Sequence, residues 1–138
     1  MAAYYQVIVE RLRQAYWPVW LAKLAEDPRI NQVLPIDFVP ETDRISVPNY
    51  DVRRIRTFLD EIREGKTLAP IDIENESSQY RITSPIRWGG PLIVDGHHRF
   101  VAAHLAGKEH IPATFGGLET TINWLTGKRK RIPEELTA

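Results

Sequence analysis

The sequence predicts a single α/β domain, because segments of strand character alternate with segments of helical periodicity along its 138 residues. The strongest strand signal is the continuous apolar run at residues 91–94, which is typical of a buried strand. The strongest helix signal is the apolar stripe within residues 52–64, which Gly65 follows as a stop. A chain of this length can bury one core of its own.

Residues 1–28 are expected to form a helical extension. Apolar side chains at helical spacing predict a helix over residues 3–17, and Pro18 ends or kinks it. A second short helix runs to about residue 26, and the pair Asp27-Pro28 then marks a turn.

The remaining elements follow with short connections. Asn49 or Asp51 is placed to cap the helix at residues 52–64. Residues 74–90 are polar and fit either a hairpin excursion or a loop. The other predicted elements are strands at residues 34–39, 68–73 and 111–115, helices at 98–106 and 119–125, a loop at 40–50 and a tail at 127–138.

Composition and charge exclude several kinds of protein. The chain holds 18 basic and 18 acidic side chains, so it lacks the net positive field of a dedicated nucleic-acid coat. It has no cysteine, which excludes disulfides, thiolate zinc sites and cysteine nucleophiles. No run approaches the ~18 consecutive apolar residues of a membrane span, and the N-terminus lacks the pattern of a signal peptide. We therefore expect a cytoplasmic protein with no membrane partner.

The sharpest signal for function is Asp95-Gly96-His97-His98-Arg99, where the buried strand is expected to run through a glycine turn into a helix. The start of a helix carries unpaired backbone N–H groups and about half a positive charge, which together attract anions. Gly96 would let a ligand approach the backbone, and Arg99 can donate two hydrogen bonds to phosphate oxygens. His97 and His98 can move protons near neutral pH. Asp95 could orient a histidine, bind a hydroxyl or meet a metal.

Each of these residues also has a purely structural interpretation. Asp95 could be the helix N-cap, Gly96 only a turn residue, and Arg99 an exposed charge on the helix. His104 is expected on the helix face and His110 in a loop. The four histidines therefore show no zinc-ligand spacing, and no metal ligand is assigned.

The same segment resembles the nucleotide-binding segment of the ParB/sulfiredoxin-like superfamily. The resemblance extends to Ala102-Ala103, Gly107, Ile111-Pro112-Ala113, the helix at residues 52–64 and the strand entry Thr67-Leu68-Ala69-Pro70-Ile71. It covers residues 33–115 and implies a small α/β domain with a mixed sheet flanked by helices. Residues 1–28 and the basic tail at 127–138 lie outside it.

Members of this superfamily differ in what they do with the bound ligand. The resemblance implies a phosphate held by the backbone of residues 96–98 and by Arg99. Chromosome-partitioning members bind and hydrolyse CTP and carry a Gly-Glu-Arg-Arg-like box, where this chain has two histidines. Sulfiredoxins place a catalytic cysteine at the position of His97, so the absence of cysteine excludes their reaction. Free-serine kinases carry a Gly-His-His-Arg segment like this one, and their loop acid corresponds to Glu41 or, as second choice, Asp43.

Our first hypothesis is therefore a nucleotide-binding enzyme that hydrolyses or transfers a phosphoryl group. Arg99 and the helix start would neutralise phosphate oxygens, and His98 or His97 would shuttle a proton. Glu41 would activate the acceptor hydroxyl or water. A magnesium ion would arrive with the nucleotide, since it needs only one or two protein carboxylates.

Two other hypotheses stay open. A nucleic-acid-binding or nuclease module is favoured by the basic run at residues 128–131 and by Trp88, which could stack on a base. A non-catalytic regulatory protein is favoured by Tyr4, Trp17 and Trp20, which suggest a helical layer or a partner surface. The sequence does not fix the oligomeric state, and a homo-oligomer is compatible with it.

Overall fold

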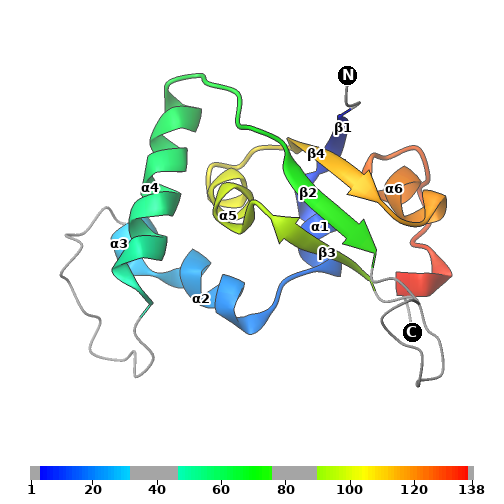
Figure 1. Ribbon diagram of the computed structural model, residues 1–138, viewed down its shortest axis with the longest axis horizontal. Helices are drawn as coiled ribbons and strands as arrows, with labels where there is room; N and C mark the ends of the chain where they lie inside the picture. The colour runs from blue at the N-terminus through cyan, green and yellow to red at the C-terminus, as the bar shows by residue number, and fades with distance from the viewer. Residues whose placement is uncertain (1–3, 32–46, 76–89, 137–138) are drawn as a thin grey trace.

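A computed structural model describes residues 4–31, 47–75 and 90–136, and it confirms the predicted α/β class (Figure 1). The strands in these ranges are β1 (Tyr5–Ile8), β2 (Ile71–Asn75), β3 (Pro91–Asp95) and β4 (His110–Gly116). The helices are α1 (Val9–Ala15), α2 (Val19–Glu26), α3 (Pro28–Asn31), α4 (Asn49–Arg63), α5 (His97–Leu105), α6 (Glu119–Leu125) and the short 3-10 helix η2 (Glu134–Leu136).

The described strands form one mixed sheet in the order β1-β4-β2-β3. Strand β4 pairs antiparallel with β1 and parallel with β2, and β2 pairs antiparallel with β3. Ile73 of β2 is in register with Ile93 of β3 and with Phe115 of β4, so three strands place apolar side chains side by side. Helix α5 connects β3 to β4, and its first turn therefore lies at the end of the edge strand β3.

The N-terminal segment differs from the prediction. Residues 5–8, expected within a helix over residues 3–17, form the edge strand β1 and pair with β4. The helix begins only at Val9. The β-branched residues Val7 and Ile8 favour an extended backbone, and the open edge of β4 offers them hydrogen-bond partners. The predicted periodicity was local, whereas the pairing that overrides it comes from about a hundred residues further along the chain.

Most other elements stand where the sequence predicts them. The predicted helices at 52–64, 98–106 and 119–125 and strands at 91–94 and 111–115 correspond to α4, α5, α6, β3 and β4. The strand expected at residues 68–73 begins only at Ile71, because Pro70 has no backbone N–H to give to a strand ladder. The strand expected at 34–39 and most of the polar segment 74–90 lie outside the described residues.

One hydrophobic core joins the sheet to the helices. Its largest fully buried side chains come from strands and helices alike and include Leu12, Leu21, Ile30, Ile55, Ile71, Ile73, Phe100, Ile111 and Leu125. Helix α5 packs against α4 and also contacts β2, β4, α1 and α2. Figure 1 shows α5 between α4 and the sheet, with α2 crossing below them.

In the three described ranges, no helix is both long enough and apolar enough to cross a membrane.

Candidate functional site

The strand–turn–helix unit predicted at residues 95–99 is present in the structure. Asp95 ends β3, Gly96 makes the turn with φ +104°, and α5 begins at His97. Residues that carry a Cβ rarely adopt a φ of this sign. Position 96 has a second reason for glycine, because a Cβ there would lie 2.5 Å from the Cγ2 atom of Ile71. The glycine therefore lets the turn pack directly on β2.

No side chain among the described residues caps the first turn of α5. Gly96 is the N-cap residue, and the first backbone bond of the helix runs from the N–H of Phe100 to the carbonyl of Gly96 at 2.9 Å. The alternative that Asp95 is the N-cap is wrong, because the left-handed turn at Gly96 places Asp95 one residue too early. The amides of residues 97–99 have no partner within the helix, so the start of α5 favours an anion.

Arg99 lies against this turn. Its side chain is 13% exposed. The structural interpretation of Arg99 as an exposed charge on the helix is therefore wrong. The Nη1 atom donates to the carbonyl of Pro70 at 3.1 Å, and Nη2 donates to Oδ2 of Asp95 at 3.2 Å. These bonds use two of the five guanidinium N–H donors. Arg99 thus ties the turn to the entry of β2 and adds a positive charge beside the start of α5.

His98 pairs with a residue that the sequence indicated only as a helix cap. Its Nε2 atom lies 2.7 Å from Oδ1 of Asp51, in the first turn of α4, and both side chains are partly buried. An ionised carboxylate only accepts hydrogen bonds, so Nε2 is a protonated nitrogen of His98. In the tautomer that this contact selects, Nδ1 carries the lone pair, which is the arrangement that a general base needs.

The start of α4 likewise has no side-chain cap from the part of the chain that the structure describes. Its N-cap is Pro48, so the prediction that Asn49 or Asp51 caps this helix is wrong. Both polar side chains instead reach other elements: Asn49 accepts a bond from Arg29 at 2.8 Å, and Asp51 contacts His98. Two uncapped helix starts therefore meet at the Asp51–His98 pair, and each contributes about half a positive charge.

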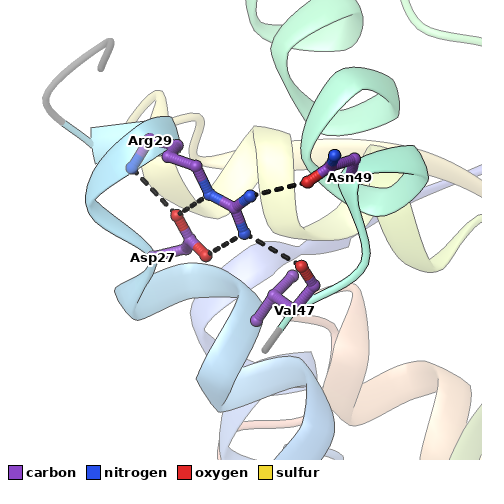
Figure 2. Close-up of polar contacts among 4 residues, drawn as sticks. All are labelled: Asp27, Arg29, Val47 and Asn49. Carbon is purple, nitrogen blue, oxygen red and sulfur yellow. Dashed lines mark hydrogen bonds and ion pairs between the residues drawn. The ribbon is translucent and has the colours of Figure 1, made fainter. Parts of the chain in front are cut away.

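A buried ion pair fixes the start of α4 (Figure 2). The side chains of Asp27 and Arg29 are 1% and 5% exposed, and Nη2 of Arg29 lies 2.8 Å from Oδ2 of Asp27. The guanidinium also donates to the carbonyl of Val47 at 2.9 Å and to Oδ1 of Asn49 at 2.8 Å. We call these four residues the Arg29 clasp. It joins the α2–α3 connection to the segment that enters α4, and so it positions Asp51 two residues later.

His97 is a packing residue in this arrangement. Its Nε2 atom lies 3.2 Å from the hydroxyl of Tyr16, and its ring centroid lies 4.8 Å from that of Trp20. Burial lowers the pKa of His97 and the neighbouring His98 lowers it further, while Asp95 opposes both. Burial also raises the pKa of Tyr16, so the phenol keeps its proton and can donate it to the ring. His97 is therefore neutral at pH 7 and attaches α5 to the α1–α2 segment.

The other residues considered from the sequence lie apart from this turn or beyond the described residues. Glu41, Asp43 and Trp88 belong to segments that the structure does not describe. His104 packs its ring on the segment between α1 and α2, and His110, expected in a loop, is the first residue of β4. Among the residues described, no three or more histidines, aspartates and glutamates gather into a group that could hold a metal ion.

Sequence reasoning missed three residues around the starts of α4 and α5. The sequence indicated Asp51 only as a cap and Trp20 only as part of an outer layer, and Arg29 carried no prediction. All three act through contacts between distant segments, which no local pattern reports. Pro48 is the one local clue, because a proline is tolerated at a helix start and would have placed Asp51 in the first turn.

No protein-family model, curated protein or solved structure matches this chain. The α/β class rests on the observed sheet and helices, whereas the ParB/sulfiredoxin-like resemblance over residues 33–115 stays a prediction. The geometry at the starts of α4 and α5 is therefore the observation that bears on the chemistry of the chain.

Proposed function

We propose that the start of α5 binds the phosphate groups of a nucleotide, and that the Asp51–His98 pair provides the general base for hydrolysis or transfer of a phosphoryl group. The observation that carries this proposal is the 2.7 Å contact between Oδ1 of Asp51 and Nε2 of His98, across the first turns of two uncapped helices. Uncapped helix starts favour an anion, and the paired histidine beside them supplies a proton acceptor.

Phosphate binding would use the backbone and one side chain. The amides of residues 97–99 donate N–H groups, and the guanidinium of Arg99 lies at the same turn. Together they would neutralise the charge that spreads over the phosphoryl oxygens in the transition state. Because Pro70 and Asp95 already hold Arg99 in place, binding would cost little ordering of its long side chain.

The proton step follows from the orientation of the Asp51–His98 pair. An acceptor hydroxyl or a water attacks the terminal phosphorus, an O–P bond forms, and the bond from phosphorus to the bridging oxygen breaks. The acceptor's proton moves to Nδ1 of His98, and the leaving phosphate takes the electron pair of the broken bond. Asp51 stabilises the resulting imidazolium through the Nε2–H bond. Glu41 stays a prediction as a further group that activates the acceptor.

A magnesium ion that arrives with the nucleotide fits this proposal through one carboxylate. Asp95 is 80% exposed and immediately precedes the turn, so it is the described carboxylate best placed to contact such an ion. Magnesium is commonly bound by substrate phosphates together with one or two protein carboxylates. When bound, the ion would neutralise charge on the phosphate oxygens.

Turnover of nucleotides tests the catalytic part of the proposal. Phosphate release or transfer is measured with ATP, GTP, CTP and UTP in magnesium, with water and with free serine as acceptors. We expect His98→Gln to lower the rate by about 100-fold or more, whereas the matched control His110→Gln, at an exposed histidine, keeps it. A rate that survives in His98→Gln would remove His98 as the base. No turnover by the unaltered chain would favour the non-catalytic regulatory alternative.

A nucleic-acid-binding role is the second candidate, and the exposed basic side chains after α6 favour it. Lys128, Lys130 and Arg131 are exposed. Replacing all three by alanine and measuring DNA affinity against salt tests this role. Each phosphate contact that is lost should reduce the slope of log affinity against log salt by about 0.9. An unchanged affinity and slope would remove this segment from nucleic-acid binding.

A further inference from the structure

We infer that an apolar pocket beside the start of α5 receives a planar ring of the same phosphorylated ligand. The inference rests on the proposed phosphate site and specifies the class of molecule that the site would take, which is a phosphate ester that carries an aromatic ring. Nucleotides join these two groups in one molecule.

The pocket lies between α2 and the start of α4 and has a volume of about 380 Å³. Its walls are mostly apolar and are formed by Val19, Trp20, Lys23, Leu24, Val47, Pro48 and Asp51. A cavity of a few hundred Å³ with apolar walls and few polar groups is typical of a small-molecule site. The pocket is therefore large enough for a ring system and has the surface chemistry that a ring requires.

Two residues of the pocket wall contact the first two residues of α5. The ring centroid of Trp20 lies 4.8 Å from that of His97, and Asp51 lies 2.7 Å from His98. A group bound at the start of α5 would therefore lie next to the pocket, with one layer of side chains between them. Because the pocket adjoins the start of α5, one ligand that carries both a ring and a phosphate could occupy both places.

The wall residues on α2 favour an aromatic occupant. Trp20 is 47% exposed and Val19 is 77% exposed, so this wall presents an indole ring and an aliphatic side chain to solvent. Stacking a planar ring on an indole removes apolar surface from water and adds a favourable ring–ring contact. A ligand that carries only phosphate would leave this surface in water and gain nothing from it.

Titration calorimetry separates the ring from the phosphate. Tripolyphosphate and each of ATP, GTP, CTP and UTP are titrated into the unaltered chain, Trp20→Ala, Val19→Trp and the control Tyr4→Ala, which changes an exposed aromatic outside the pocket. We expect the best nucleotide to bind the unaltered chain about tenfold or more tightly than tripolyphosphate. Trp20→Ala and Val19→Trp should abolish this preference and keep tripolyphosphate binding, whereas Tyr4→Ala should keep both.

Val19→Trp decides the result, because it fills the pocket at an exposed position and leaves the contact between Trp20 and His97 in place. Loss of the nucleotide preference in this variant supports the ring site. Retention of the preference overturns it, as do nucleotides that bind no more tightly than tripolyphosphate. Failure of tripolyphosphate and of all nucleotides to bind would instead overturn the phosphate site, and the ring site with it.

Discussion

The Nη1 atom of Arg29 donates to Oδ1 of Asn49 at 2.8 Å, and this bond ties α3 to the first residue of α4. Asp51 follows two residues later and meets His98 at the start of α5. The position of the Asp51–His98 pair thus depends on the buried ion pair between Asp27 and Arg29, which lies outside α4 and α5. The Arg29 clasp stabilises the fold and also positions the candidate site.

Loss of the arginine should destabilise the fold strongly. In Arg29→Met we expect the free energy of unfolding, measured by urea denaturation, to fall by about 3–5 kcal/mol, because Asp27 is left buried without its partner. The double variant Asp27→Leu/Arg29→Met should recover part of this loss, since it buries no charge. A loss below about 1 kcal/mol in the single variant would contradict this role of the clasp.

Two glycines with positive φ form a matched pair for testing the turn before α5. Gly96 has φ +104° and would place a Cβ 2.5 Å from Ile71, whereas Gly107 has φ +71° and open space around it. Gly107→Ala should cost about 1–2 kcal/mol of unfolding free energy, from backbone strain alone. Gly96→Ala should cost at least about 1 kcal/mol more, from the added steric clash. Equal losses would show that the turn does not pack on β2 as described.

Acid should weaken the fold through two partly buried histidines. Burial lowers the pKa of both His97 and His104 from the ordinary value of 6.5. Between pH 6.5 and the lower pKa values of the two histidines in the folded chain, the unfolded chain binds more protons than the folded one. The free energy of unfolding therefore falls as pH falls. The double variant His97→Gln/His104→Gln should have a shallower dependence on pH between 7 and 5 in urea denaturation. His110→Gln, at an exposed histidine, serves as control. If the double variant loses stability with falling pH as steeply as the unaltered chain, His97 and His104 do not cause the acid sensitivity.

Local chemistry accounts for the parts of the fold that the sequence predicts. The apolar run before Asp95 and the glycine at position 96 each act on their own neighbours, and together they predict β3, the turn and α5. Gly65, with φ +80°, likewise ends the helical segment at the expected place. These features need no knowledge of distant residues, because backbone conformation and side-chain periodicity decide them.

Three features that the sequence did not predict depend on contacts between distant segments. Strand β1 forms because β4 offers an open edge, although residues 5–8 also match a helical spacing. Asp51 and His98 are 47 positions apart, and their pairing follows from how α4 packs on α5. The guanidinium of Arg29 is buried where Asp27, Val47 and Asn49 accept its hydrogen bonds. Periodicity and turn chemistry contain no information on such pairings.

The claim on which the proposed chemistry depends is that the open amides at the start of α5 bind an anion. The most direct measurement is a backbone ¹H–¹⁵N NMR titration of the chain with tripolyphosphate and with the tightest-binding nucleotide. We expect the largest saturable shifts at the amides of His97, His98 and Arg99. Amides that do not respond there, or largest shifts at residues 128–131, would contradict the claim.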